Sequence, residues 1–231
     1  MLFKNSNLKL GIRAGLPIAL GYFPIAIAFG ALAGQAQLTW LEGVMMSCLV
    51  FAGTSQFVGV SLLLGGTGHL QIIAATLFLN MRHLIMSVAV NDQMREFPPA
   101  WKRGLSFFIT DETFALLTLG KEENSQDRTP LFAAGLMVTA YSGWVFGTLV
   151  GGLGAGFIPA QITTAMTVGL YGLFIGLLIP SAKKSRPFAL IAVLGMVINW
   201  GLSHCVESGW AIVIATVVAA GIGIPLTGGE E

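Results

Sequence analysis

The sequence predicts an all-α protein, a polytopic integral membrane helix bundle of seven or eight spans that forms one domain over residues 1–231. Only 10% of the residues are charged, against roughly 25% in ordinary soluble domains, and 55% are hydrophobic. Successive apolar runs have the length of about 20 residues that a helix needs to cross a bilayer. The expected surroundings are therefore the lipid bilayer. Nucleic acid is not an expected partner, because no basic patch with interleaved aromatic residues is present.

Charges, prolines and glycines divide the chain into eight apolar segments, which are the candidate spans. The segments are residues 14–33, 41–64, 70–90, 104–119, 131–155, 161–180, 188–206 and 210–226. The fourth segment is the weakest, because it is short and contains Asp111 and Glu112. The bundle therefore has eight spans if the fourth segment crosses the membrane and seven if it does not.

The positions of Lys and Arg predict a cytoplasmic N-terminus. If all eight segments span, most of the basic residues fall on the cytoplasmic side, as the positive-inside rule requires. A basic start followed by an apolar run also resembles a secretory signal that is cleaved near Ala31–Ala33. A retained first span is favoured, because the run is long and contains Pro17 and Pro24.

The third segment carries a cation and an imidazole in the middle of an apolar run. On a continuous helix, Thr76, Asn80, His83 and Ser87 form one polar stripe, which cannot face lipid. Arg82 lies about 100° round from His83 and needs a partner elsewhere. A cation at that depth costs at least about 2.5 kcal/mol. Either an ion pair joins two helices, or the segment forms a substrate or proton site in which His83 titrates near neutral pH.

The second segment is interrupted by small and polar residues at Gly53, Thr54, Ser55 and Gln56. Discontinuous helices of transporters expose backbone N–H groups at the start of a half-helix, where the helix dipole favours an anionic group. Thr54 and Ser55 suit such a start, and Gly53 tolerates the dihedral angles of a break. The alternative is a continuous helix whose small residues pack on a neighbour.

The fourth segment contains Thr110 followed by Asp111 and Glu112. This order is an ordinary signature of a helix N-terminus, with carboxylates in the first turn. In the functional interpretation, one carboxylate pairs with Arg82, and the other carries protons or binds a substrate ammonium group. Spacing does not decide which acid pairs with Arg82, because the residues lie on different segments.

These elements, in this order, resemble the AzlC family of bacterial inner-membrane proteins, which includes the YgaZ-type exporters. The resemblance rests on the Gly- and Pro-containing first span, on Phe51-Ala52-Gly53-Thr54-Ser55-Gln56-Phe57, on Asn80-Met81-Arg82-His83-Leu84 and on Thr110-Asp111-Glu112. It implies export of valine, leucine or isoleucine together with a small AzlD-type membrane subunit on a separate chain. No Walker A motif is present. A proton-coupled secondary transporter is therefore expected, with no enzymatic activity, cofactor or metal.

The resemblance and the polar positions together give the expected site. Expected substrate-binding residues are Gly53, Thr54, Ser55, Gln56, Asn80, Arg82, Asp111 and Glu112, and expected proton-coupling residues are His83, Asp111 and Glu112. Spans one, two and six would supply an apolar pocket that includes Phe57 and Tyr171. A transporter or channel for another small solute and a non-transporting scaffold subunit remain as alternatives. A weak echo between residues 79–83 and 198–204 also allows an internal repeat, parallel or inverted.

Overall fold

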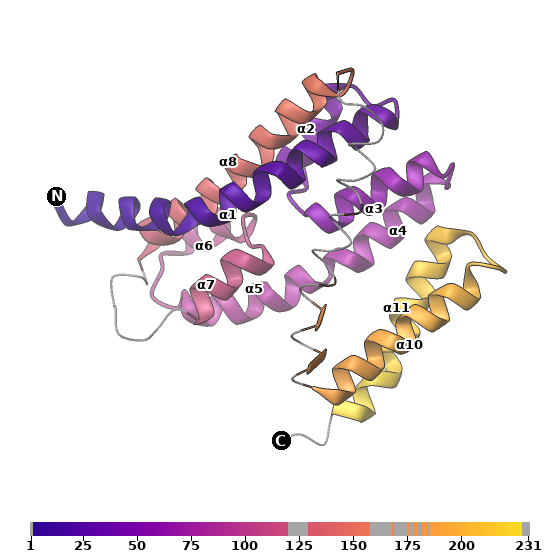
Figure 1. Cartoon of the computed structure of the whole chain (residues 1–231). Helices are drawn as coiled ribbons and strands as arrows, with labels where there is room; N and C mark the ends of the chain where they lie inside the picture. The colour runs from indigo at the N-terminus through magenta and orange to yellow at the C-terminus, as the bar shows by residue number, and fades with distance from the viewer. Residues whose placement is uncertain are drawn as a thin grey trace. The chain divides into compact units, whose positions relative to one another are not determined.

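The computed structural model describes residues 2–119, 129–157 and 185–227, with a few positions between 168 and 183. Within these residues every regular element is an α-helix, as predicted (Figure 1). The helices are α1 (Leu2–Gln35), α2 (Trp40–Leu49), α3 (Gly53–Leu64), α4 (His69–Asn80), α5 (Arg82–Gln93), α6 (Pro99–Ser106), α7 (Asp111–Leu119), α8 (Pro130–Gly154), α10 (Arg186–Leu202) and α11 (Ser208–Thr227).

The chain divides into two compact units, and each is described by itself. The first unit contains residues 1–56 and 80–158, and the second contains residues 57–79 and 159–231. The boundary falls inside α3 and at the end of α4. The single domain over residues 1–231 stays a prediction.

The long helices α1 and α8 form the scaffold of the first unit and lie side by side along much of their length (Figure 1). Glycines let the two backbones approach closely, as the small-residue pattern of membrane helix pairs requires. A Cβ atom on Gly151 would lie 2.1 Å from the carbonyl oxygen of Ile27, and one on Gly30 would lie 2.4 Å from that of Thr148. These positions therefore exclude any side chain while the two helices stay in contact.

The second apolar segment is broken, as predicted, into α2 and α3. Thr39 caps α2 in a capping box with Glu42, and α2 ends at Leu49. Phe51 then takes a positive φ of 43°, a conformation that non-glycine residues seldom adopt. A new helix begins at Gly53. The structure thus confirms a discontinuous helix and contradicts the alternative of a continuous one.

The third apolar segment contains a smaller break. Met81 separates α4 from α5 while keeping helical dihedral angles. Near it the Leu84 N–H bonds to the Met81 carbonyl oxygen at 3.0 Å, a tighter i to i−3 contact. The predicted polar stripe therefore crosses a local break and does not follow one regular helix.

Four described helices are long and apolar enough to cross a membrane. They are Ser6–Gln35, His69–Gln93, Pro130–Gly154 and Ser208–Pro225. The apolar helices α2, α3 and α10 are shorter, and the fourth predicted span is two short helices, α6 and α7. The segment 161–180 lies outside the residues that the structure describes continuously. Seven or eight spans therefore remain a prediction, beside the four that length and composition support.

In the second unit, α10 and α11 pack along each other (Figure 1). A Cβ atom on Gly223 would lie 2.6 Å from Cδ1 of Ile191, so the two helices pack closely at this position. A small apolar core joins α3, α4 and α11 through Leu62, Ala75 and Val213. At one end, the amide of Gln71 donates a hydrogen bond to Glu207. This unit contains none of the charged residues predicted for the site.

Candidate functional site

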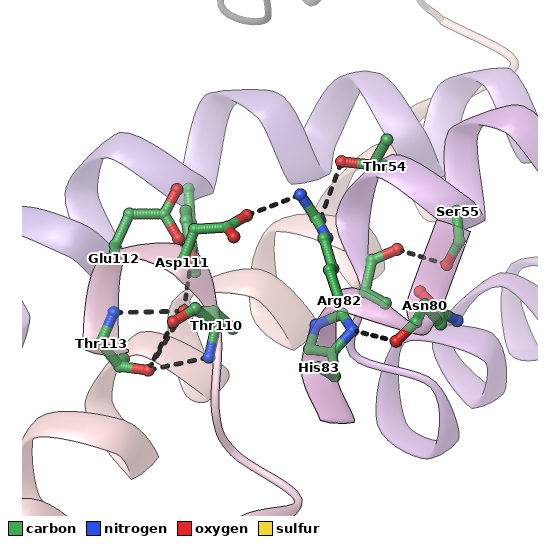
Figure 2. Close-up of polar contacts among 11 residues, drawn as sticks. Thr54, Ser55, Asn80, Arg82, His83, Thr110, Asp111, Glu112 and Thr113 are labelled. Atoms are coloured by element: carbon green, nitrogen blue, oxygen red, sulfur yellow. Dashed lines mark hydrogen bonds and ion pairs between the residues drawn. The ribbon is translucent and has the colours of Figure 1, made fainter. Parts of the chain in front are cut away.

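Arg82, the first residue of α5, joins three helices of the first unit. Its Nη1 lies 2.8 Å from Oδ2 of Asp111 at the start of α7, and its Nη2 donates to Oγ1 of Thr54 on α3 at 3.2 Å (Figure 2). The sequence predicted an acid on another segment as the partner but left Asp111 and Glu112 as alternatives. The structure selects Asp111. Both side chains are about 40% exposed (40% for Arg82 and 39% for Asp111), so the ion pair remains accessible.

The two acids occupy the first turn of α7, so the helix-start interpretation is also correct. Thr110 precedes the helix, and its N–H donates to Oγ1 of Thr113 at 2.9 Å. The Thr113 N–H in turn donates to Oγ1 of Thr110 at 3.4 Å, which closes a reciprocal cap. Neighbouring helical residues point about 100° apart. The cap therefore aims Asp111 at α5 while Glu112 faces α1.

Tyr22 on α1 receives Glu112. The Tyr22 hydroxyl lies within hydrogen-bond distance of the Glu112 carboxylate and 2.9 Å from Oγ1 of Thr110. A phenol donates only one proton, and it goes to the carboxylate, because a charged oxygen accepts more strongly than a hydroxyl. The sequence interpretation gave Tyr22 no role. The signal that it carries is a hydroxyl in the apolar first span, next to Gly21 and close to Pro24.

Gln56 closes the break between α2 and α3 from inside. Its Oε1 accepts from the Ala52 N–H at 3.2 Å and from the Trp144 indole N–H at 3.0 Å, and its Nε2 donates to Oγ of Ser47 at 3.0 Å. Ser47 also bonds Thr148 on α8 at 2.8 Å. Gln56 is 1% exposed, and its amide oxygen and nitrogen are already hydrogen-bonded to other residues of the protein. Its predicted role as a substrate ligand stays a prediction, whereas its positioning role is visible in these bonds.

The first turn of α3 carries the other predicted residues of the second segment. Gly53 lies directly against the Trp144 ring, where a Cβ atom would approach to 2.8 Å. Ser55 is buried, and its Oγ donates to the Ala52 carbonyl oxygen at 3.0 Å. Only Thr54 turns its side chain toward Arg82 (Figure 2). The backbone N–H groups of a first helical turn have no partner within the helix, so this turn can donate to an anion.

His83 and Asn80 line a cavity of about 220 Å³ beside the same break. The cavity is also lined by Val50, Phe51, Ala52, Ser106, Phe107 and Ile109. Nδ1 of His83 lies 3.1 Å from the Asn80 carbonyl oxygen (Figure 2). Because a carbonyl oxygen only accepts, Nδ1 carries the hydrogen in this bond. Nε2 of the neutral ring is then the nitrogen that can take up a proton.

The contacts described above do not include the remaining predicted positions. Of the predicted polar stripe, Thr76 donates to the Ile72 carbonyl oxygen at 2.8 Å in the second unit, and Ser87 lines a different cavity of the first unit. Phe57 is buried and belongs to the second unit, and Tyr171 lies outside the described residues. Among the described residues, no group of three or more His, Cys, Asp or Glu side chains could hold a metal ion.

Comparison with known proteins places the chain among membrane proteins. Residues 17–158 match the family model for the AzlC protein. A membrane protein of Archaeoglobus fulgidus is 29% identical over 233 residues, covering 100% of this chain and 98% of that protein. The inner membrane protein YgaZ of Escherichia coli is 31% identical over 189 residues, covering 80% and 77%. The branched-chain amino acid transport protein AzlC of Bacillus subtilis is 26% identical over 199 residues, covering 84% and 77%. No solved structure matches.

Proposed function

The chain belongs to the AzlC family of membrane proteins, and from this premise we propose that it exports branched-chain amino acids across a bacterial inner membrane. The matched range, residues 17–158, contains the ion pair, the helix break and Tyr22. The name of the B. subtilis relative supports valine, leucine and isoleucine as cargo. The proposal is a transport function without catalysis.

The observation that carries the proposal is the accessible ion pair between Arg82 and Asp111. A zwitterionic amino acid needs a donor set for its carboxylate and an acceptor for its ammonium group. The substrate carboxylate takes the place of Asp111 on the Arg82 guanidinium, whose planar fork suits two parallel hydrogen bonds to a carboxylate. Asp111, once released, accepts the ammonium group. This exchange leaves the net charge of the site unchanged, which limits the cost of charge in the membrane.

Thr54 and the first turn of α3 complete the carboxylate site in this scheme. The Thr54 hydroxyl already bonds Arg82 at 3.2 Å, so it moves with the guanidinium. Asn80 lines the cavity of about 220 Å³ at the break and supplies further hydrogen bonds. The polar groups recognise the part that all amino acids share, whereas the aliphatic side chain of the cargo requires an apolar surface.

Proton coupling is assigned first to titratable groups of the site that do not pair with Arg82. Asp111 has its partner in Arg82, whereas Glu112 bonds the neutral Tyr22 hydroxyl. Glu112 and the free Nε2 of His83 therefore take up external protons in exchange for cargo, and Asp111 joins them while substrate occupies Arg82. Titratable groups inside membrane segments are typical of such proton relays.

The proposed molecule has seven or eight spans with a cytoplasmic N-terminus and is one transport domain. The break between α2 and α3 is the kind of discontinuous helix that forms midplane sites in secondary transporters. A small AzlD-type membrane subunit works with it, as the resemblance implies.

Valine efflux from preloaded cells tests the assignment of Arg82. Arg82→Ala should abolish efflux while the protein remains in the membrane, because the carboxylate site and the partner of Asp111 disappear together. Arg95→Ala is the matched control: Arg95 pairs with Asp92 at 2.7 Å, but both side chains are largely exposed. The control should leave efflux within about twofold. Unchanged efflux in Arg82→Ala would refute the site.

Two further measurements separate the alternatives. Efflux from vesicles loaded with different small solutes shows whether branched-chain amino acids are the preferred cargo. Efflux that persists in cells lacking this chain would identify it as a scaffold. Collapse of the pH gradient should slow efflux if protons drive the exchange.

A further inference from the structure

A second cavity, of about 240 Å³, lies on α5 and α6 and shares only Ser106 and Ile109 with the cavity at the helix break. Its lining is Ser87, Val90, Asn91, Met94, Lys102, Arg103, Ser106 and Ile109. Five of these residues are polar or basic, and Val90, Met94 and Ile109 are apolar. The ligand that fits such a lining carries an anionic group joined to an apolar group.

The lining includes two adjacent cations, Lys102 and Arg103. The ammonium group of Lys102 donates to Oδ1 of Asn91 at 3.2 Å, which holds it across the cavity. No acid lines the cavity, and the ion pairs of the described residues involve only Arg82 and Arg95. Within the part of the chain that the structure describes, no carboxylate pairs with Lys102 or Arg103, so their positive charge attracts an anion.

The apolar part belongs to the core of the first unit. Val90, Met94 and Ile109 are 1%, 5% and 4% exposed and pack in one hydrophobic cluster. A free inorganic anion gains nothing from these side chains, whereas each methylene group placed on them contributes about 0.8 kcal/mol. The shape of the cavity thus favours a ligand with a hydrocarbon chain.

The composition of α6 indicates that this cavity lies at the membrane surface. Trp101, next to Lys102, is 37% exposed, and Phe107, directly after the helix, is 42% exposed. Exposed aromatic residues beside Lys and Arg are typical of helices at the headgroup level of a bilayer. Pro99 begins the helix, which ends at Ser106 and is too short to cross the membrane.

We propose that this cavity binds an anionic phospholipid, with its phosphate on Lys102 and Arg103 and the start of an acyl chain on Val90, Met94 and Ile109. A volume of about 240 Å³ is smaller than that of sites enclosing drug-sized ligands, roughly 300–1,000 Å³. The rest of the lipid therefore stays in the bilayer. Because α5 begins with Arg82, the bound lipid contacts the helix that carries the proposed transport cation.

Lipid binding to the full-length chain in detergent tests this proposal by native mass spectrometry. Phosphatidylglycerol should bind more tightly than phosphatidylcholine of the same acyl chains. The double variant Lys102→Gln/Arg103→Gln should lower the affinity for phosphatidylglycerol about thirtyfold, or about fivefold for each cation. The control Lys9→Gln/Arg13→Gln removes two exposed cations of α1 that lie outside the cavity and should change nothing.

A second variant and a competitor keep the test decisive. Ser87→Phe fills the apolar side of the cavity without changing charge and should also weaken phosphatidylglycerol binding. Inorganic phosphate at millimolar concentration should not displace the lipid. Equal binding of phosphatidylcholine, equal losses in the control variant, or displacement by phosphate would each overturn the proposal, the last in favour of a free-anion site.

Discussion

Replacement of the buried Gln56 should destabilise the break between α2 and α3. Gln56→Leu keeps a similar volume but removes three hydrogen bonds, to the Ala52 N–H, the Trp144 indole N–H and the Ser47 hydroxyl. Two donors are then left without an acceptor at a site that is 1% exposed. An unsatisfied buried donor costs about 1–3 kcal/mol. Ser47 keeps its bond to Thr148. For the two donors together we therefore expect a loss of about 2–6 kcal/mol of unfolding free energy.

Unfolding by SDS in mixed micelles measures this loss. The matched control is Gln35→Leu, the same chemical change at an exposed residue at the end of α1. Exposed substitutions usually stay within about 0.5 kcal/mol. Trp144→Phe removes one of the same bonds, so its effect and that of Gln56→Leu should not be additive. If Gln56→Leu lowers the unfolding free energy no more than Gln35→Leu, the hydrogen bonds of Gln56 do not stabilise the break between α2 and α3.

Two other substitutions test the scaffold and the proton assignment. Gly151→Ala should lower stability by about 1–3 kcal/mol in the same unfolding assay, because its Cβ atom would lie 2.1 Å from the backbone of α1. The control is Gly21→Ala, which should be neutral because nothing lies within 4 Å of the added Cβ atom. Equal effects of the two substitutions would contradict the close packing of α1 and α8. His83→Asn keeps an N–H donor for the Asn80 carbonyl oxygen but cannot titrate, so valine efflux should continue with weaker stimulation by a pH gradient, because Glu112 still takes up protons. Full stimulation in the variant would exclude His83 from the proton path.

The need of Arg82 for an acid could be predicted from the sequence, because a cation at membrane depth is costly anywhere in a bundle. Which acid pairs with it could not. Asp111 and Glu112 are adjacent in sequence, and only the direction of α7, set by the Thr110 cap, sends one to α5 and the other to Tyr22. The partner choice is thus a consequence of helix orientation.

The role of Gln56 shows the opposite case. Local pattern predicted a break, and the break is present, but the same pattern made Gln56 a candidate ligand. Its hydrogen-bond partners come from α2 and α8, and Trp144 is 88 residues away in the chain. Local spacing contains no information about such a contact. Tyr22 was missed for the same reason, since its partner Glu112 is 90 residues distant.

The sequence by itself predicted the membrane environment of this protein, its helical class, the break in its second segment and the polar residues that cannot face lipid. These follow from composition and local order, because bilayer energetics acts on each segment separately. Only the tertiary structure shows that Asp111 pairs with Arg82 and that Gln56 is buried. It also shows that Lys102 and Arg103 line a cavity together with apolar side chains. Those facts depend on which faces of distant helices meet, and that is settled by the packing of the whole bundle.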